Sequence, residues 1–572
     1  MPLARLFAVF VAAWSLHALA EPQGPASDSP FTLLAVPDDG VGYFTRHMRA
    51  RELWREGKYA EAEPLLESLV REYPRDGWNW RTLARVKARL GKPLEAAEAN
   101  RRAGPLEGWD VENPIGYRLA INYVAADDRK RALETLRWMI VDQHGLHRSA
   151  LYEWDELKAL REDREFLDLI GRYDTKQWSR DDGWRRDIDF LHEEAKRVNP
   201  EYRDKPFPPE VVRRLERLKR DVPRLSDEEI YTGMYAMLAP LRQGHTVLWP
   251  MPGARFLPLR FYVFPEGLYV IEGREGYAEL AGARVVSIGK LPAEEAWRRL
   301  NALRSYDGEM ELAWGVFILA DAAVLKGIGA IDSMERVDLG VEMRDGSSRK
   351  VSVTTKEGMP QERIDRLVAP AGREPPLFLS HMDRVFWHVP MPKLDAFYVQ
   401  VNNVADAPDE TLEQYGRRLW TELGKSSAAH LILDLRHNNG GNSLTYPELL
   451  RTVIAFSRVP GHRVYVLIGR RTYSAAANLI TDLERLADAV FVGEASSECC
   501  RLHGDPTTAE LPYSKVKAEL TAVIWNLSSP ADRRREMSPH LPVRLTAKAY
   551  LAGEDPALEA LERAIARERA KK

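Results

Sequence analysis

The sequence contains only two cysteines in 572 residues, and these two, Cys499 and Cys500, are neighbours. A framework of several disulfides, of the kind that holds many small exported domains together, is therefore excluded. Neighbouring α-carbons lie about 3.8 Å apart, which is below the range that an unstrained disulfide prefers. The pair is either a strained vicinal disulfide or two buried thiols, and the sequence leaves both interpretations open.

The sequence also lacks a surplus of charge of either sign. Lys and Arg number 82 against 85 Asp and Glu, which gives a formal net charge of -3. This balance provides no global attraction to nucleic acid or to an anionic membrane surface, so we expect no nucleic-acid partner. With 45% hydrophobic and 29% charged residues, the composition is that of a globular protein. The length predicts about two to four folded units.

Long apolar runs are scarce, and the run at the N-terminus is too short to span a bilayer comfortably. Arg5 is the only charge in residues 1–20, the apolar run covers residues 6–16, and the segment ends in Ala-Leu-Ala. These are the three parts of a secretory signal peptide. A membrane anchor is the alternative, which the short run disfavours. We therefore expect cleavage after Ala20 and export to the periplasm or the extracellular space.

One other apolar stretch, residues 313–331, is long enough to compare with a membrane span. Asp321 and Lys326 interrupt it, and each would be costly in hydrocarbon. We expect a buried helix here and no membrane span after cleavage of the signal.

Internal repeats follow an expected linker over residues 21–48, whose first part is rich in Pro, Ser, Gly and Asp. The sequence around Gly57 (Gly-Lys-Tyr-Ala-Glu-Ala) recurs around Gly91 (Gly-Lys-Pro-Leu-Glu-Ala), 34 residues later, and more weakly around Ala132. This period resembles that of tetratricopeptide repeats, which we expect over residues 49–175. Such arrays bind peptides or partner proteins. A stabilising role without a ligand is the alternative.

The hydrophobic pattern of the sequence changes twice over the rest of the chain. Residues 180–250 have helical periodicity, and residues 251–365 contain short apolar and aromatic runs separated by Gly and Pro, which are typical of strands. Within the latter, residues 282–292 resemble the later half of a PDZ module, although the glycine loop that opens a full PDZ domain is not evident. Residues 366–572 alternate strands and helices, which predicts a layered α/β core.

Two segments of this core place residues with chemical potential at strand ends. Residues 431–442 run from a buried strand into a turn with Gly440 and Gly441, whose backbone N–H groups can face an oxyanion because no side chain blocks the approach. Residues 464–478 place Ser474 at the start of a small-residue helix, where developing negative charge is favoured. Taken alone, the first is an ordinary strand-to-helix turn and the second an N-cap serine.

Two further segments complete the pattern. His245 lies in the sequence Gln-Gly-His-Thr, where helices give way to strands. A lone histidine is usually structural, but one in such a loop can reach across a cleft as a general base. Residues 542–559 by themselves indicate only a turn and a final helix.

Together and in this order, the four segments resemble the C-terminal processing (tail-specific) serine proteases and the tricorn core protease. The resemblance covers residues 184–572, and its specific parts are Asp-Leu-Arg-x-Asn-x-Gly-Gly and Thr-x-Ser-Ala. It implies an α+β multidomain protein in which a ClpP/crotonase-like α/β core with a PDZ-like, β-rich insertion follows the helical repeats. It also implies Ser474 as the nucleophile and the amides of Gly440 and Ala475 as oxyanion donors.

The chain departs from this family at the place of the catalytic lysine. Processing proteases of the Ser–Lys type carry a lysine where Cys499 stands here, so we do not expect a Ser–Lys dyad. The tricorn-like branch uses histidine with serine and an acid, which makes His245 the expected base. His503, in the same atypical loop, is an alternative base. The acid stays open, with Glu494 and Glu536 as candidates.

The expected function is that of an exported serine endopeptidase that cleaves polypeptides without a metal or a cofactor. An unactivated serine hydroxyl is a poor nucleophile at neutral pH, and the sequence offers a base to activate it. The alternative is a catalytically inactive binding or scaffold protein with a peptidase fold, because a fold alone does not determine activity.

The signal-peptide interpretation predicts that the mature protein begins at Glu21. N-terminal sequencing of the protein recovered from the periplasm or the medium measures this directly. Recovery of a cytoplasmic protein that retains Met1 would contradict export.

Overall fold

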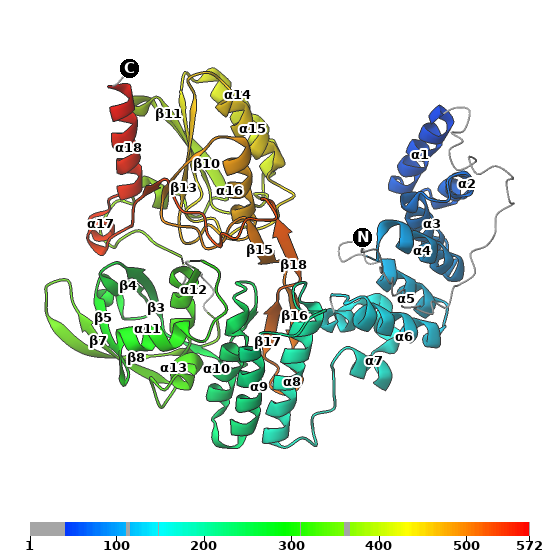
Figure 1. The fold of residues 1–572 in the computed structure, drawn as a ribbon, viewed down its shortest axis with the longest axis horizontal. Helices are drawn as coiled ribbons and strands as arrows, with labels where there is room; N and C mark the ends of the chain where they lie inside the picture. Colours follow the sequence, from blue (N-terminus) through cyan, green and yellow to red (C-terminus); the bar gives the residue numbers. More distant parts are fainter. Residues whose placement is uncertain (1–39, 110–114, 147, 309, 360–365, 571–572) are drawn as a thin grey trace, which may run out of the picture. The chain divides into compact units, whose positions relative to one another are not determined.

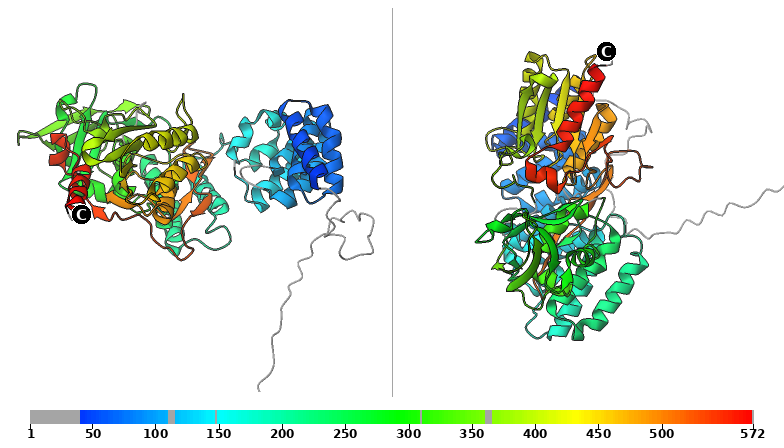
Figure 2. Two further views of the ribbon diagram at one scale, coloured as in Figure 1. Left: turned by 90° about the horizontal axis from the view of Figure 1, so that it is seen from above. Right: turned by 90° about the vertical axis from the view of Figure 1, so that its left-hand side faces the viewer.

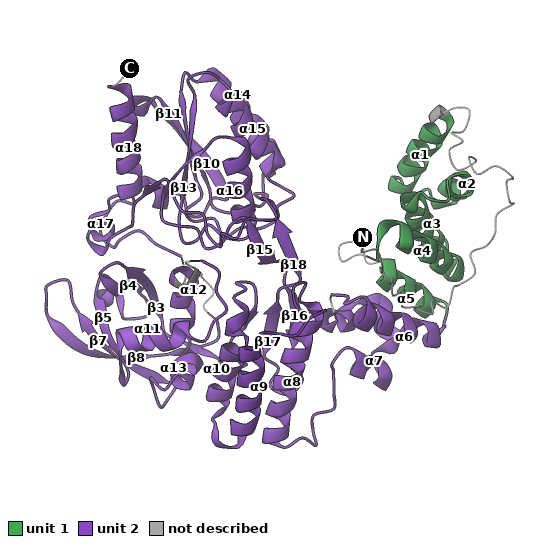
Figure 3. Ribbon diagram, viewed as in Figure 1, with its two compact units in different colours: residues 1–126 green, residues 127–572 purple. Residues whose placement is uncertain are grey.

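The computed structural model describes residues 40–109, 115–146, 148–308, 310–359 and 366–570 of the chain. The chain forms two compact units, residues 1–126 and residues 127–572, which Figure 3 colours separately. The predicted signal peptide, residues 1–20, lies outside the described residues, as does most of the predicted linker.

The first unit is a series of helices (Figure 1). They are α1 Gly40–Arg55, α2 Tyr59–Glu72, α3 Gly77–Arg89, α4 Pro93–Glu107 and α5 Ile115–Ala125. Gly57 and Gly91 follow α1 and α3 with φ angles of 73° and 72°, a left-handed conformation that favours glycine. Ala62, Leu66 and Leu69 of α2 are buried in the core of this unit. The repeated glycine therefore ends the first helix of each pair, as the 34-residue spacing predicts.

The end of the predicted repeat region belongs to the second unit. Its two α-helices are α6 Arg129–Arg137 and α7 Arg164–Leu169. Between them, residues 138–160 include short π and 3-10 turns in place of a full helix pair. The Arg197 guanidinium donates to the carbonyls of Ile140 and Gly145, each at 2.8 Å, and so attaches these turns to the helices that follow.

Residues 180–250 are mostly helical, as their periodicity predicts. The helices are α8 Arg180–Val198, α9 Pro209–Asp221 and α10 Asp227–Leu238. Asp187 of α8 is buried, and its carboxylate accepts the N–H groups of Tyr513 and Ser514, each at 2.7 Å. This contact links the helical region to a segment more than 300 residues later in the sequence.

The next region contains an antiparallel sheet in which β3, β4, β5, β7 and β8 are neighbours in that order and β6 pairs with β5. The strands are β3 Leu259–Phe264, β4 Gly267–Gly273, β5 Arg284–Ile288, β6 Leu291–Pro292, β7 Arg336–Glu342 and β8 Ser348–Thr354. A separate short pair joins β2 Arg255–Phe256 to β9 Lys356–Glu357. The accompanying helices are α11 Ala293–Asn301, α12 Met310–Leu319 and α13 Ala322–Gly327.

The apolar stretch of residues 313–331 falls on α12 and α13. Asp321 separates the two helices and caps α13, because its carboxylate accepts the Ala323 N–H at 2.9 Å. Within the part of the chain that the structure describes, no helix has both the length and the apolar character that crossing a membrane requires.

The second large sheet is mostly parallel. Its strand order is β10-β11-β12-β13-β14-β19, and only the pairing of β10 with β11 is antiparallel. The strands are β10 Phe386–Met391, β11 Ala396–Val401, β12 His430–Asp434, β13 Arg463–Ile468, β14 Val490–Gly493 and β19 Leu541–Pro542. The helices are α14 Leu412–Lys425, α15 Pro447–Ser457, α16 Ala475–Leu486, α17 Ala547–Ala552 and α18 Pro556–Arg569.

Helices cover both faces of this parallel sheet (Figures 1 and 2). Leu431 and Leu433 of β12 pack in one cluster with α14, α15 and α16, whereas Ile432 between them packs in another with α18. Burial on both faces explains why the strands are continuous apolar runs. Because the strands are parallel, the carboxyl ends of β12, β13 and β14 lie at one edge, where loops bring distant residues together.

Two small antiparallel sheets join the helical region to this edge. Their strands are β1 Val247–Leu248, β16 Thr507–Glu510 and β17 Lys517–Leu520 in one, and β15 Arg501–Gly504 and β18 Val523–Asn526 in the other. Val247 pairs with Glu519 in the register of β1 and β17, so the loop before β1 lies beside the segment that follows Cys500. The expectation of a multidomain protein of mixed helices and sheets, with helical repeats at its N-terminus, is confirmed.

Candidate active site

Ser474 occupies an unusual backbone conformation between β13 and α16. Its φ of 55° and ψ of -124° lie outside the regions that non-glycine residues normally adopt, and such conformations cost about 1–3 kcal/mol. The preceding turn is held in place, because the Thr472 hydroxyl donates to the Leu435 carbonyl at 2.9 Å and the Tyr473 N–H to the Asn438 carbonyl at 3.1 Å. The turn after β12 thus supports the conformation of Ser474.

His245 meets Ser474 across 229 residues of sequence. The Nε2 atom of His245 lies 3.2 Å from the Oγ atom of Ser474, which is hydrogen-bonding distance. The imidazole stacks on the Tyr473 ring, with ring centroids 4.5 Å apart and an interplanar angle of 18°. Both the distance to Oγ and the orientation of the ring are those that a general base needs.

Glu498 touches both of these residues. Its Oε1 atom lies 3.4 Å from Nδ1 of His245, an ion-pair contact that lacks the alignment of a hydrogen bond. Its Oε2 atom accepts the backbone N–H of Ser474 at 3.0 Å. The Glu498 side chain is 1% exposed and that of His245 is 10% exposed. A buried carboxylate therefore links the backbone of the serine to the far side of the histidine.

Two nearby carboxylates, those of Glu498 and Asp307, affect the charge of the His245 imidazole. Burial by itself lowers the pKa of His245, but the negative charges of Glu498 and, more weakly, Asp307 outweigh burial and raise the pKa above its usual 6.5. A raised pKa means that the surroundings favour the imidazolium, the form that a base reaches after it accepts a proton.

Asp307 holds the histidine loop from the other side. Its Oδ2 atom accepts the Gly244 N–H at 2.7 Å, and its Oδ1 atom lies 3.3 Å from the Arg535 guanidinium. Burial, together with the nearby charge of Glu498, raises the pKa of Asp307 to about 7. No sequence motif singles out Asp307, because its place beside the histidine loop depends on the tertiary fold.

The two expected oxyanion donors differ in their availability. Ala475 is the first residue of α16, and its N–H donates to no acceptor among the described residues. Gly440 lies against the same turn, since a Cβ on it would come within 2.7 Å of the Ala475 nitrogen and of the Ser474 Cβ. The Gly440 N–H, however, donates to the Asn438 side chain at 2.9 Å. In this structure only the Ala475 N–H is open.

Glu494 does not approach His245, contrary to its tentative assignment as the acid. The two oxygens of its carboxylate accept hydrogen bonds from Nε and Nη2 of Arg470, at 2.8 and 2.9 Å. The reason is local: the Glu494 N–H bonds to the Ile468 carbonyl, which keeps this residue at the sheet edge. The chain then turns back, and Glu498 reaches the histidine instead.

The other candidates from the sequence also lie elsewhere. His503 is buried on β15, and its Nε2 atom lies 3.0 Å from Glu201, so it is not placed as a base for Ser474. Glu536 lies beside Gly308, and the acid that His245 contacts is Glu498. Cys499, at the place of the family's lysine, is joined to Cys500 by a disulfide, which decides between the two interpretations of this pair.

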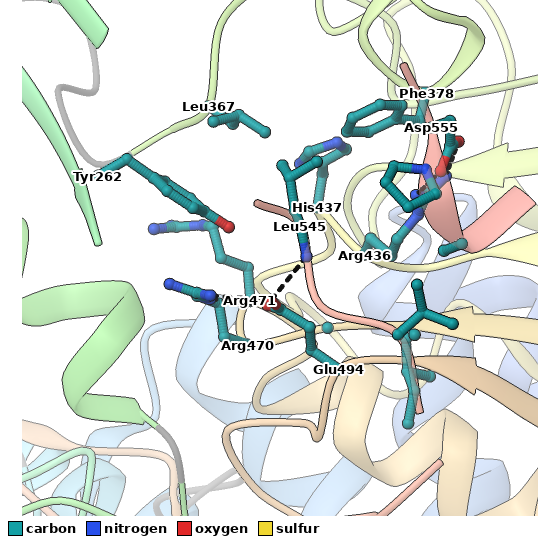
Figure 4. A pocket seen from close by; sticks show the side chains of 16 residues that line it. Tyr262, Leu367, Phe378, Arg436, His437, Arg470, Arg471, Glu494, Leu545 and Asp555 are labelled. Carbon is teal, nitrogen blue, oxygen red and sulfur yellow. Dashed lines mark hydrogen bonds and ion pairs between the residues drawn. The ribbon is translucent and has the colours of Figure 1, made fainter. Parts of the chain in front are cut away.

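A separate pocket opens at the carboxyl ends of the parallel strands (Figure 4). We call it the strand-end pocket and define it by six of its lining residues, Tyr262, His437, Arg470, Arg471, Glu494 and Asp555. Ser474, His245 and Glu498 do not line it.

Residues 45–86 match the family model of the tetratricopeptide repeat, and no curated protein matches the chain in sequence. Among solved structures, mature CPAF complexed with lactacystin superposes with a TM-score of 0.51 at 12% identity, over 68% of this chain and 99% of that one. Residues of the second unit share the CPAF fold. At this identity, the likeness extends to the fold alone.

Two further solved structures are similar at a lower level. The photosystem II D1 C-terminal processing protease has a TM-score of 0.31 at 14% identity, over 66% of this chain and 97% of that one. The tricorn protease has a TM-score of 0.32 at 11% identity, over 67% of this chain and 37% of that one. The predicted resemblance to tetratricopeptide repeats is confirmed by the match of residues 45–86, and the fold of the second unit is similar to that of CPAF.

The contact between Glu498 and His245 predicts that Glu498→Gln lowers the pKa of His245. The substitution removes a negative charge that favours the imidazolium and leaves burial to act with less opposition. The titration of the His245 Cε1–H signal in histidine-labelled protein, followed by NMR, measures the shift.

Glu494→Gln is the matched control, because it makes the same chemical change at an acid that pairs with Arg470 and does not touch His245. The pKa of His245 in Glu494→Gln should equal the pKa of His245 in the wild-type protein. Equal shifts in the two variants, or a rise in Glu498→Gln, would contradict the placement of Glu498.

Proposed function

We propose that the protein is an exported serine endopeptidase of the tail-specific kind, in which Ser474 attacks the peptide carbonyl, His245 acts as general base and Glu498 supports the histidine. The observation that carries this proposal is the 3.2 Å contact between Nε2 of His245 and Oγ of Ser474, with Glu498 against both residues. The substrate is a polypeptide, and the proposed reaction uses no metal and no cofactor.

In the first step, the Ser474 oxygen attacks the carbonyl carbon while Nε2 of His245 takes the hydroxyl proton. The charge of Glu498 stabilises the imidazolium that forms. The same proton then goes to the amine of the leaving peptide, which leaves an acyl group on Ser474. Water then attacks the acyl carbon while His245 takes a proton from the water. The second product is released when Ser474 regains this proton from His245.

The oxyanion of the tetrahedral intermediate would form near the start of α16. The open N–H of Ala475 and the N-terminal end of this helix provide a hydrogen-bond donor and a favourable dipole for negative charge. The Gly440 N–H can serve as a second donor only if substrate displaces its hydrogen bond to Asn438. Gly440 itself must stay glycine, because a side chain there would collide with this turn.

The backbone of Ser474 contributes to the mechanism. Its strained conformation places Oγ toward His245 in place of the capping position, and no capping hydrogen bond is made by this hydroxyl. The N–H bond from Ser474 to Glu498 helps to hold the conformation. One acid thus positions the nucleophile and stabilises the charged base at the same time.

The other regions have roles that follow from their type. We assign a ClpP/crotonase-like core to residues 366–572 and a PDZ-like insertion to residues 251–365, whose antiparallel sheet and helices suit a module that presents substrate. The repeats in the first unit would bind a protein partner or part of a substrate. The signal peptide would place all of these in the periplasm or outside the cell.

The mechanism predicts that Ser474→Ala and His245→Ala each reduce peptide hydrolysis by at least about 1,000-fold, and that the double variant is little worse than either. The two groups act as a unit, so the loss of one removes the function of the other. Hydrolysis of unfolded proteins and of peptides, measured by product analysis, tests this. The melting temperature of Ser474→Ala should be close to that of the wild type, since the Ser474 hydroxyl makes no capping hydrogen bond.

Ser333→Ala serves as the control, because it removes an exposed hydroxyl that accepts the Glu335 N–H and contacts none of the proposed catalytic residues. It should retain full activity. Wild-type activity in Ser474→Ala would overturn the proposal, and so would the absence of hydrolysis by the wild type between about pH 5 and pH 9, where histidine changes its charge. Activity should rise with pH through the pKa of His245, because only the neutral imidazole accepts a proton.

A further inference from the structure

We infer that the strand-end pocket binds a small carboxylate. This site is distinct from the proposed catalytic residues, and the inference stands whether or not the protein is a protease. Figure 4 shows the lining side chains arranged around the ends of the parallel strands. In α/β sheets, ligands commonly bind at the carboxyl ends of such strands.

The carboxylates in the lining are already engaged. Both oxygens of Glu494 accept hydrogen bonds from Arg470, at 2.8 and 2.9 Å. Both oxygens of Asp555 accept from Arg436, at 2.7 and 2.8 Å. The lining therefore contains two acids, Glu494 and Asp555, and three arginines, Arg436, Arg470 and Arg471. Arg436 also pairs with the buried Asp434, so these arginines and acids balance in formal charge. The two lining acids have little remaining capacity for a cationic ligand.

Donors remain unused in the same wall. His437 is buried and 7% exposed, and its Nε2 atom has no hydrogen-bond partner among the described residues. Burial lowers the pKa of His437 to about 4, and the nearby arginines add to this effect, so the ring is neutral near pH 7 with one N–H to donate. A buried polar atom that lacks a partner is unfavourable, and a bound acceptor would supply the missing hydrogen bond.

The Tyr262 hydroxyl is the second donor. No hydrogen bond is formed by this hydroxyl within the described residues, and Figure 4 shows it directed toward the space between the arginines and His437. Burial raises the pKa of Tyr262, so the phenol keeps its proton. The Arg470 guanidinium lies over the Tyr262 ring, 4.6 Å from its centroid, and fixes its position.

The start of α18 adds a backbone donor. This helix has 14 residues, and its third-position Leu558 N–H is capped by Asp555 at 3.1 Å. The Ala557 N–H, which belongs to a residue of the pocket wall, donates to no acceptor among the described residues. The positive end of a helix dipole favours an anion at this place.

The size and the remaining walls select the class of anion. The cavity volume is about 60 Å³, room for about four to six water-sized groups. Leu367, Phe378 and Leu545 add apolar surface to the pocket, and Phe378 stacks on the His437 ring. A carboxylate with a short apolar tail can use both the donors and this apolar surface, whereas a fully polar oxyanion would leave the apolar surface unused.

Arg471 ties the pocket to the nucleophile turn. It lines the pocket, and its Nε donates to the Asn439 side chain at 3.0 Å, next to Gly440. Ser474 follows three residues later in the same turn. The strand-end pocket and the turn that holds Ser474 therefore share Arg471.

Titration of the full-length protein with propionate tests the inference, with propionamide as the neutral isostere and inorganic phosphate as the polar oxyanion. The His437 Cε1–H signal in histidine-labelled protein reports binding. We expect saturable binding of propionate, a rise in the pKa of His437 because the ligand's charge favours the imidazolium, and no saturable binding of propionamide.

Tyr262→Phe, which removes one hydroxyl, should weaken propionate binding by about tenfold or more. Tyr269→Phe is the matched control, since Tyr269 pairs with Tyr262 across β3 and β4 but does not line the pocket; it should bind as the wild type does. Ser474→Ala should also bind normally, which separates this result from the proposed catalysis. No saturable binding of propionate, equal binding of propionamide, tighter binding of phosphate, or equal affinity in Tyr262→Phe and Tyr269→Phe would each overturn the inference.

Discussion

The buried carboxylate of Glu498 is the constraint on which the candidate site depends. It lies between the backbone N–H of Ser474 and the imidazole of His245, and it is almost wholly removed from solvent. A buried negative charge is costly unless nearby donors or cations compensate it. The N–H of Ser474 provides one donor, and the imidazolium of the reaction provides a cation. The site is therefore arranged to stabilise the charge that develops when His245 takes a proton.

Three segments from distant parts of the sequence must be held together for this arrangement. The histidine loop is attached through the pairing of β1 with β17 and through the bond from Gly244 to Asp307. The serine turn is attached to the turn after β12 through Thr472 and Tyr473. The acid's loop is attached to the serine turn, because the Ser497 N–H donates to the Thr472 carbonyl at 3.1 Å. Parallel strands make this convergence possible, since their ends share one edge.

The sequence predicts the elements with local signals well and the contacts between them less well. The glycine spacing of 34 residues locates the helix pairs, and apolar runs locate β12 and β13, because both patterns reflect local burial. Ser474 and His245 stand out through short motifs. Glu498 does not, because its position depends on how the chain folds back after β14, a tertiary feature. The sequence leaves Glu494 and Glu536 as candidate acids. No local pattern in the sequence shows that Glu494 pairs with Arg470.

Covalent labelling tests the central claim, the activation of Ser474 by His245, most directly. Native protein is treated with a fluorophosphonate, which forms a phosphorus–oxygen bond to an activated serine and releases fluoride, and peptide mass spectrometry then locates the adduct. The account predicts one fast-reacting serine, Ser474, whose labelling slows when the pH falls below the pKa of His245 and when His245 is replaced by alanine. An unlabelled Ser474, or labelling that is spread evenly over exposed serines and does not depend on His245, would contradict it.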